Sequence, residues 1–364
     1  MGAGHPSQAA VRRAVREALP PRLASARPTS PRFEVLGTAP TGGITSNREG
    51  ALVLAAVSGG PDSLALAAAL AAEAPALGVR GGAVIVDHRL QPGSDVVAEK
   101  AAEQCRELGL DPVEVVAVTV PRDGSGPEAA ARTARYAALD EAADRLGATA
   151  ILLGHTRDDQ AEQVLLGLLR GSGARALAGM PPTRGRYVRP FLELPRSVTL
   201  EACDAWGVTP WRDPHNDDPN YARVRARRAL VVLTEELGAD PRVALARSAA
   251  QLRADADYLD AEAAAALSRF EVMATAGAVP NTSNRGEVGT VPVGDLAALP
   301  TAIRTRVWRS LLLTHGAPAG QLAHTHIAAC DRLLTQWTGQ GPIHVPGPLQ
   351  VRRSAGRIEI AALR

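Results

Sequence analysis

Short apolar runs alternate with longer helical segments between residues 50 and 155. The runs are rich in Val, Leu, Ile and Ala, and they predict strands at residues 51–57, 83–87, 113–118 and 149–153. The Ala- and Leu-rich segments between them predict helices at residues 62–77, 94–108 and 127–146. A glycine follows each of these helices at once, which is a usual stop signal. Apolar strands that alternate with helices are typical of parallel sheets covered on both faces, so the pattern predicts an α/β fold with a doubly wound, mainly parallel sheet.

The pattern changes after about residue 230. An Ala-rich helix is predicted at residues 240–268, followed by a Gly/Asn/Thr-rich loop at 272–290 and by helices at 296–314 and 320–336. The chain ends in alternating apolar and polar residues, which are typical of a small strand pair. We therefore expect a second, mainly helical domain.

The N-terminal segment differs from both of these regions. Residues 7–19 have the spacing of a short basic amphipathic helix. Residues 20–49 are rich in Pro, Ser, Thr and Gly, which predicts a flexible insert before the first strand.

Composition narrows the class of protein. The 364 residues suit two domains, and a hydrophobic content of 46% suffices for their cores, although only 3% of the residues are aromatic. The net charge of +2 is too small to indicate nucleic-acid binding by itself. Nearly all basic residues are arginines, which suit phosphates, although a GC-rich genome would give the same bias. The three cysteines are far apart and no apolar segment approaches the roughly 18 residues of a membrane span, so we expect a soluble cytoplasmic protein.

The hexapeptide at residues 58–63 is the most informative part of the sequence. It joins the first predicted strand to the first predicted helix, and it consists of Ser58, Gly59, Gly60, Pro61, Asp62 and Ser63. A glycine turn at a helix N-terminus presents unpaired N–H groups to an anion, and the carboxylate and two hydroxyls suit a phosphate with a metal ion beside it. The spacing matches neither a Walker A loop nor a dinucleotide-binding loop. It resembles the pyrophosphate-binding loop of the N-type ATP pyrophosphatases, which split ATP into AMP and pyrophosphate.

Other polar residues follow the strands at the same edge of the predicted sheet, where ligands of such sheets bind. Asp87 and His88 follow the second strand, and His155 follows the fourth, where it could instead be a satisfied strand-end histidine. The next helix places Asp159 and Glu162 on one face of its first turn. These two carboxylates are suited to hold Mg²⁺ or to bind an incoming ammonium group.

Arginines on two further segments are candidate ligands of phosphate or RNA. Arg132 and Arg135 lie one helical turn apart, although a solvated helix face has the same spacing. Residues 211–228 run from an acidic, Asn-rich turn into a basic helix, and their arginines are Arg212, Arg223, Arg225, Arg227 and Arg228. Four arginines within six residues cannot all share one helix face. An RNA backbone is their natural partner, and pairing with the preceding aspartates is the alternative.

Taken together, these segments resemble those of the tRNA(Ile)-lysidine synthetase family. The matching pieces follow the family's order and comprise residues 58–63, 86–88, 131–136, 155–162, 170–173, 189–190 and 211–228. The resemblance implies an adenine-nucleotide hydrolase-like fold, with a catalytic PP-loop domain at 50–232 and a tRNA-binding domain at 233–364. Residues 1–49 do not match. Gln163 stands where the family usually has Thr, and we expect altered local contacts there without loss of activity.

The resemblance implies a two-step reaction. ATP would first adenylate the carbon-2 oxygen of the wobble cytidine in tRNA(Ile) with a CAU anticodon, and the ε-amine of free L-lysine would then displace AMP. The implied catalytic residues are Asp62, Arg135, Asp159 and Glu162, with Mg²⁺ on Asp62 and Asp159. The implied ATP ligands are residues 58–63 with Asp87, His88 and His155. The implied tRNA ligands are Arg132, Arg212, Arg223, Arg225, Arg227 and Arg228.

Other interpretations use the same loop. A tRNA thiolase or an amidotransferase-type synthetase is one alternative, but the chain has no Cys pairs for the first and no N-terminal glutaminase nucleophile for the second. A non-catalytic module that binds ATP or RNA is another, although such a module would not need Asp62, Asp159 and Glu162. The sequence does not set the oligomeric state, and it leaves a homodimer open.

Overall fold

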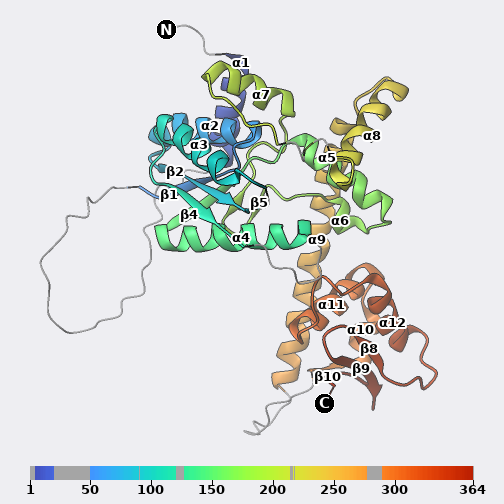
Figure 1. Ribbon diagram of the computed structural model, residues 1–364. Coiled ribbons are helices and arrows are strands. Elements are labelled where there is room, and N and C mark those ends of the chain that lie inside the picture. Colours follow the sequence, from blue (N-terminus) through green and yellow to red (C-terminus); the bar gives the residue numbers. More distant parts are fainter. Residues whose placement is uncertain are drawn as a thin grey trace, which may run out of the picture. The chain divides into compact units, whose positions relative to one another are not determined.

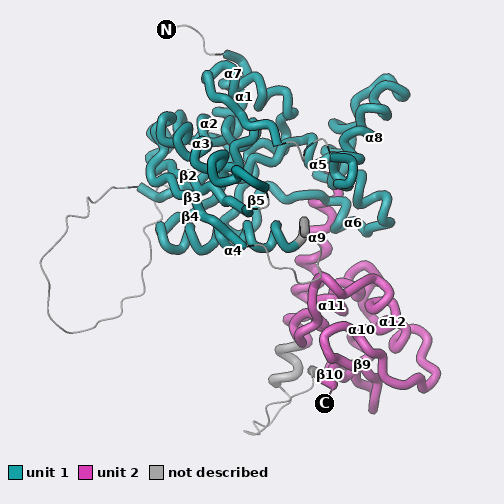
Figure 2. Tube along the Cα trace, viewed as in Figure 1, with its two compact units in different colours: residues 1–250 teal, residues 251–364 magenta. Residues whose placement is uncertain are grey.

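The computed structural model describes residues 5–19, 50–89, 91–119, 127–213, 216, 218–276 and 289–363. The chain divides into two compact units, residues 1–250 and 251–364, which are shown in different colours in Figure 2. The domain boundary expected after residue 232 stays a prediction, and the insert predicted at residues 20–49 lies outside the described residues. In the described part of the chain, none of the helices has the length and apolar character needed to cross a bilayer.

The first unit is built on a six-stranded sheet with the order β3-β2-β1-β4-β6-β5 (Figure 1). Its strands are β1 (Leu52–Val57), β2 (Arg80–Asp87), β3 (Val113–Ala117), β4 (Ala148–Leu153), β5 (Thr183–Arg184) and β6 (Tyr187–Val188). Only β5, which pairs with β6, runs antiparallel to its neighbour. The mainly parallel sheet predicted from the sequence is therefore confirmed. The chain turns outward in opposite directions from β1, which puts a crevice for ligands beyond the carboxyl ends of β1 and β4.

Helices cover both faces of this sheet. On one face lie α2 (Pro61–Leu77) and α3 (Ser94–Glu107), with α1 (Pro6–Ala18) and α7 (Arg196–Trp206) packed against α2. On the other face lies α4 (Pro127–Leu146). The expected helices at 7–19, 62–77, 94–108 and 127–146 are thus confirmed to within one residue at each end.

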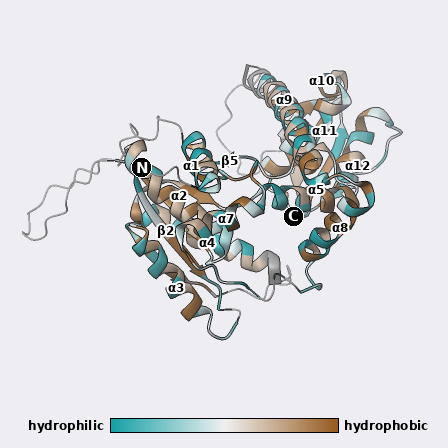
Figure 3. Ribbon diagram, turned by 90° about the horizontal axis from the view of Figure 1, so that it is seen from above, coloured by the Kyte–Doolittle hydropathy of each residue, from teal (hydrophilic) through white to brown (hydrophobic). Residues whose placement is uncertain are grey.

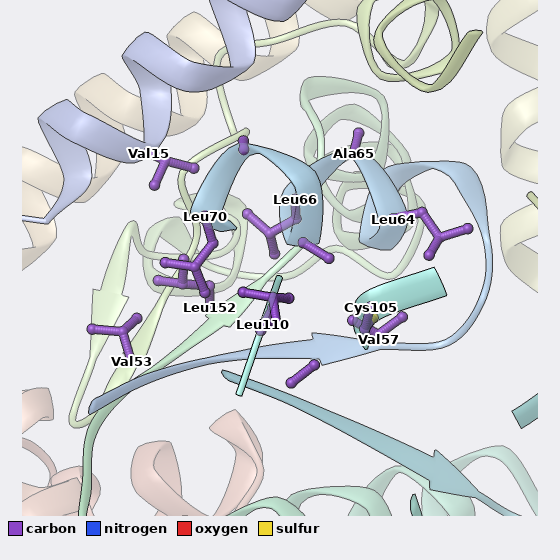
Figure 4. Close-up of a cluster of buried hydrophobic side chains, with 14 of the residues drawn as sticks. Val15, Val53, Val57, Leu64, Ala65, Leu66, Leu70, Cys105, Leu110 and Leu152 are labelled. Atoms are coloured by element: carbon purple, nitrogen blue, oxygen red, sulfur yellow. The ribbon is translucent and has the colours of Figure 1, made fainter. Parts of the chain in front are cut away.

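Both faces of β1 are buried, which explains why this strand is apolar throughout. Val53 and Val57 pack toward α2 together with Leu66 and Leu70, as Figure 4 shows, while Leu54 packs with the residues of α4 on the opposite face. Viewed by hydropathy, the strands around β2 are mostly brown, as expected for strands covered on both sides (Figure 3).

An ion-pair cluster fastens the N-terminal helix to the rest of the unit. Glu73 on α2 is fully buried, and its carboxylate accepts hydrogen bonds from Arg12 Nε at 2.6 Å and Arg16 Nε at 2.7 Å. The hydrogen bond from Arg16, followed by that from Arg12, holds the pKa of Glu73 below its usual value against the opposing effect of burial. Two arginines of α1 are therefore paired with α2, although both side chains stay partly exposed.

Four helices complete the first unit and lead out of it. They are α5 (Arg157–Leu169), α6 (Ala174–Leu177), α8 (Ala222–Leu237) and α9 (Pro241–Ala276), of which α5 and α8 pack against each other. The Ala-rich helix expected at residues 240–268 is α9, and it continues to Ala276. The division between the two units falls within α9.

The second unit combines helices with a larger sheet than the predicted strand pair. Its helices after α9 are α10 (Val293–Ala298), α11 (Thr301–Thr314) and α12 (His324–Thr335), and its strands are β7 (Gly289–Pro292), β8 (Ile343–Val345), β9 (Leu349–Ser354) and β10 (Arg357–Ala362). The strands form an antiparallel sheet in the order β7-β10-β9-β8. Of the loop expected at residues 272–290, residues 277–288 lie outside the described residues. The expectation was wrong for residues 272–276, which belong to α9, and for residues 289 and 290, which start β7, because a strand of four residues is too short to show an alternation. The helix expected at 296–314 is interrupted before α11 by Pro300, which lacks the N–H that a continuing helix needs.

Gly154 directly follows β4 and lies in close contact with the start of α2. A Cβ atom at this position would lie 2.9 Å from the carbonyl oxygen of Asp62 and 3.2 Å from the backbone nitrogen of Ser63. Backbone atoms cannot swing aside as a flexible side chain does, so only glycine permits β4 to approach the hexapeptide this closely.

We expect Gly154→Ala to push the hexapeptide away from β4, with a loss of about 1–3 kcal/mol in the free energy of unfolding. Chemical denaturation and ATP titration would measure the effect on stability and on the loop. The matched control is Gly173→Ala, because Gly173 has an ordinary φ of −71° and a Cβ atom added there would meet no other atom within 4 Å. Equal stability and equal ATP affinity in the two variants would contradict this role of Gly154.

Candidate active site

A cavity of about 540 Å³ lies beyond the carboxyl ends of β1 and β4. Its walls come from the hexapeptide, α4, α5, the start of α7 and the segment that leads into α8. Five of the six hexapeptide residues line it, as do Arg135, His155, Asp159 and Glu162, which the sequence predicted for this site. The structure thus brings together residues that lie about a hundred positions apart in the chain.

The hexapeptide forms a braced turn at the N-terminus of α2. Gly59 has a φ of +80°, and Gly60 is the N-cap residue with Pro61 at the first helical position. The hydroxyl of Ser63 donates to the carbonyl oxygen of Gly60 at 2.9 Å, and it accepts a hydrogen bond from the backbone N–H of Ser58 at 3.1 Å. The turn is therefore closed on itself, and the free N–H groups at the start of α2 remain available to an anion.

Arg196, the first residue of α7, binds the carboxylates of the site together. Its Nη2 lies 2.7 Å from Oδ1 of Asp159, its Nε 3.1 Å from Oδ2 of Asp62, and its Nη1 3.7 Å from Oε1 of Glu162. The hydroxyl of Thr199 on α7 also binds Asp62. The side chains of α2 and α5 are thus fixed against each other by one guanidinium from a third helix.

The two carboxylates of α5 have different surroundings. Both oxygens of Asp159 are engaged, because Oδ2 accepts from the backbone N–H and the hydroxyl of Thr156 while Oδ1 accepts from Arg196. Glu162 is 1% exposed, and its Oε1 accepts from Arg227 Nε at 2.8 Å. Its Oε2 is buried and has no hydrogen-bond partner in the part of the chain that the structure describes. Glu162 therefore has one carboxylate oxygen without a partner among the described residues, whereas each oxygen of Asp159 already accepts a hydrogen bond.

Burial and charge shift the titration of the acidic residues. Burial raises the pKa of Asp62, although Arg196 and Thr199 oppose this effect. For Asp159 burial acts in the same direction, but the charge of Arg196 and the N–H of Thr156 outweigh it, and the pKa lies below its usual value. Three carboxylates here face two guanidiniums, those of Arg196 and Arg227, which leaves an excess of negative charge on this side of the cavity.

A positive wall faces these carboxylates. It consists of Arg135 and Arg223, and the charge of Arg189, which does not line the cavity, also acts on His155. In the described part of the chain, Arg135 has no carboxylate within ion-pair distance, and burial lowers its pKa. A guanidinium that lines a cavity in this way is suited to a phosphate or another anion.

His155 lies between the two charged sides. Burial, assisted by the charges of Arg135, Arg189 and Arg223, lowers its pKa to about 3 in spite of the opposing charge of Asp159. Its Nδ1 is buried without a partner among the described residues, which leaves an atom available to a ligand. The imidazole is therefore neutral. It is not a strand-end histidine whose ring nitrogens are all hydrogen-bonded within the described residues.

The remaining predicted ligands lie outside this cavity. Asp87 is buried and accepts a hydrogen bond from the backbone N–H of Arg89 at 2.9 Å, and His88 has a buried Nδ1 without a partner. Burial, together with Arg135, lowers the pKa of His88. The guanidinium of Arg132 is exposed and stacks on Tyr136, 5.1 Å from the ring centre. None of these residues lines the cavity, so their assignment to ATP or tRNA stays a prediction.

The arginines at the start of α8 point to two different sides of the helix, as their spacing required. Arg223 and Arg227 line the cavity, and among the described residues Arg227 pairs with Glu162 and not with an aspartate that precedes the helix. Arg225 and Arg228 are exposed, and Nη1 of Arg225 donates to the carbonyl oxygens of Pro219 and Asn220. The tRNA-binding roles of these four arginines stay predictions.

The sequence analysis missed Arg196. Asp158, next to the predicted carboxylates, accepts a hydrogen bond from the Arg196 backbone N–H at 2.9 Å and pairs with Arg242 at 3.2 Å, which sets the start of α7 beside α5. The only signal was indirect, since Asp62, Asp159 and Glu162 required a cation that no residue near them in the sequence supplies.

The donor set fits a metal ion only in part. Among the described residues, no group of three or more His, Cys, Asp or Glu side chains is arranged to hold a metal. Asp62 and Asp159 do lie close together, because one guanidinium contacts both. Since Mg²⁺ takes one or two carboxylates and completes its shell with phosphate and water, the pair suits an ion that arrives with a nucleotide.

The fold and the hexapeptide site define a PP-loop protein, and the comparisons agree. The family model of the PP-loop domain matches residues 41–234, and the model described as TilS substrate binding domain matches residues 292–359. Among solved structures, the U34-tRNA thiolase NcsA from Methanococcus maripaludis has a TM-score of 0.51 at 16% identity, over 68% of this chain and 78% of that chain, which shows a shared fold.

Curated relatives identify the family within this class. The tRNA(Ile)-lysidine synthase of Streptomyces coelicolor is 53% identical over 85% of this chain and 85% of its own length, and that of Thermobifida fusca is 52% identical over 86% and 92%. The synthase of Salinispora arenicola is 45% identical over 99% of this chain and 98% of its own length. This chain belongs to the tRNA(Ile)-lysidine synthase family.

The titration of His155 gives a pH-dependent prediction. The unfolded chain takes up a proton on this residue near its ordinary pKa of 6.5, whereas the folded protein takes it up only near 3. Between these values the unfolded state binds more protons, so the free energy of unfolding falls as the pH falls, by up to about 1.4 kcal/mol per pH unit. Denaturant titrations from pH 7 to pH 4 would show a shallower decline in His155→Gln than in the wild type. Parallel declines would contradict a neutral, desolvated imidazole.

Proposed function

We propose that this protein ligates L-lysine to carbon 2 of the wobble cytidine in tRNA(Ile) with a CAU anticodon, with ATP split into AMP and pyrophosphate. The observation that carries the proposal is the pairing, in one cavity, of a pyrophosphate-type loop with a buried Glu162 oxygen that has no partner. The first feature suits an activating nucleotide, and the second suits a cationic nucleophile. Membership in the tRNA(Ile)-lysidine synthase family supports the same reaction.

The activation step uses the positive parts of the site. The N–H groups at the start of α2 receive the phosphates, while Arg135 stabilises the charge that develops when the carbon-2 oxygen of the cytidine attacks the α-phosphorus of ATP. Pyrophosphate leaves, and the cytidine carries AMP. Bound Mg²⁺, held by Asp62 and Asp159 together with phosphate oxygens, would neutralise part of the leaving charge.

The second step uses the negative side of the site. The lysine side chain arrives as an ammonium and must lose a proton before its nitrogen can attack carbon 2. Oε2 of Glu162 accepts a hydrogen bond from the ammonium and then takes its proton, since Oε1 already accepts from Arg227 and both oxygens of Asp159 already accept hydrogen bonds. Asp159 then serves to hold Arg196 and the start of α5, which fixes the place where the amine approaches. The attack forms the C–N bond and releases AMP.

The tRNA reaches the cavity past α8. Arg225 and Arg228 are exposed on this helix, while Arg223 and Arg227 of the same helix line the cavity. The outward pair is suited to phosphates of the anticodon stem, and the second unit, matched by the substrate-binding model, is proposed to hold the rest of the tRNA. A homodimer stays a prediction.

A labelling experiment tests the reaction. The protein with ATP, Mg²⁺, ¹⁴C-lysine and a CAU-anticodon tRNA(Ile) transcript should transfer label to the tRNA, with one AMP and one pyrophosphate released per lysine. A transcript with uridine at the wobble position should take up no label, because uridine carries a hydrogen on N3 and an oxygen on carbon 4 where cytidine has a bare N3 and an amine. An unlabelled CAU transcript after incubation with folded protein would overturn the proposal.

The roles given to the two carboxylates lead to a kinetic prediction. Glu162→Gln should raise KM for lysine about tenfold or more, since a charge-assisted hydrogen bond to the ammonium is worth about 1.5–3 kcal/mol. The control is Gln163→Thr, because Gln163 is adjacent in sequence but does not line the cavity. Its KM for lysine should be close to that of the wild type. Steady-state assays with varied lysine would measure both values. An unchanged KM in Glu162→Gln would assign the ammonium to another group.

A further inference from the structure

A second cavity, of about 310 Å³, lies on the other side of the hexapeptide turn. Gly59 lines this second cavity, whereas its neighbours Ser58 and Gly60 line the first, and the two cavities have no lining residue in common. Its other walls are α3 and the segment at residues 209–212. A nucleotide that fills the first cavity therefore leaves the second one free.

The walls of the second cavity are fixed by backbone hydrogen bonds. The N–H of Trp211 donates to the carbonyl oxygen of Gly59 at 2.9 Å. The side-chain amide of Gln104 on α3 pairs with both backbone groups of Thr209, at 2.8 Å to its N–H and 3.3 Å to its carbonyl oxygen. The segment at residues 209–212 is thus tied both to the hexapeptide and to α3, and the cavity between them is a built feature.

The lining suits an aromatic ring with a phosphate beside it. Val97 and Ala101 provide an apolar wall, and the half-buried indole of Trp211 offers a surface for stacking. Lys100 and Arg212 are exposed at the cavity, and in the described part of the chain neither has a hydrogen bond or an ion pair. None of the described residues that line the cavity carries a carboxylate. Base–aromatic stacking next to unpaired cations is how proteins bind single-stranded nucleic acid.

We infer that this second cavity binds a nucleotide of the anticodon loop that flanks the target cytidine, with its base on Trp211 and its phosphates on Lys100 and Arg212. This inference rests on the proposed function. The flanking nucleotide and the target lie on opposite sides of one turn, so the loop must be splayed open around the hexapeptide. An RNA is favoured over free ATP, because both cations are exposed and a polymer brings several phosphates to the surface.

Cross-linking tests the position of the RNA. A tRNA(Ile) transcript with 4-thiouridine at each nucleotide that flanks the wobble cytidine is irradiated with the wild-type protein, and the modified peptides are identified by mass spectrometry. We expect cross-links within residues 97–104 or 209–212. Cross-links confined to other segments would overturn the inference.

Binding measurements test the chemistry. Trp211→Ala should raise Kd for the transcript about tenfold, and Trp211→Phe, which keeps a ring to stack on, should recover most of the affinity. Both variants retain the backbone hydrogen bond to Gly59. The double variant Lys100→Ala/Arg212→Ala should lower the slope of log Kd against log salt by about two, one for each phosphate contact. Arg13→Ala removes an exposed arginine of α1 that lines neither of these cavities, and its salt slope should equal that of the wild type.

Two further measurements distinguish a failure of the second site from a failure of the proposed function. Kd for ATP without RNA should be the same in wild type and in the Trp211 and Lys100/Arg212 variants, and a loss of ATP affinity with RNA affinity unchanged would assign the cavity to adenine and overturn the inference. Lysine labelling of the CAU transcript by the wild type reports the proposed function by itself. Labelling with no change in RNA binding by any of these variants would refute the second site alone.

Discussion

The guanidinium of Arg196 is the interaction on which the site depends. Asp62 comes from α2, and Asp159 and Glu162 come from α5, and each of these carboxylates contacts Arg196. Without this cation, three negative charges would face one another in a partly buried cavity, and like charges in such places suppress ionisation. The position of Arg196 is set in turn by its own backbone, which Asp158 and Thr199 bind. One residue at the start of α7 therefore determines the arrangement of two other helices.

The hexapeptide turn lines both cavities, because successive residues of the turn face opposite sides. Ser58 and Gly60 line the first cavity and Gly59 lines the second, while Gly154, which follows β4, packs against the backbone at the start of α2. A parallel sheet makes this possible, since it delivers β1 and β4 to the same edge as neighbours. The two cavities are therefore separated only by the backbone of this turn.

The sequence predicted those parts of the fold and site that depend on neighbouring residues. The four apolar strands, the helices between them and the hexapeptide all show in local patterns, and each is present in the structure. Arg196 could not be found in this way, because its partners lie up to 134 positions away and a lone arginine after a proline has no distinctive pattern. The strand β7 was missed for a related reason, since its four residues become a strand only through pairing with β10.

The two carboxylates of α5 show why spacing alone does not assign chemistry. Asp159 and Glu162 are three residues apart and share a helix face, so their spacing alone predicts the same role for both. The shorter side chain, at the third position of the helix, reaches back to Thr156 and is used to cap it. The longer one extends into the cavity, where Arg227 occupies one oxygen and the other stays without a partner. A difference of one methylene group thus separates a residue that builds the site from one whose free oxygen can receive a hydrogen-bond donor of a ligand.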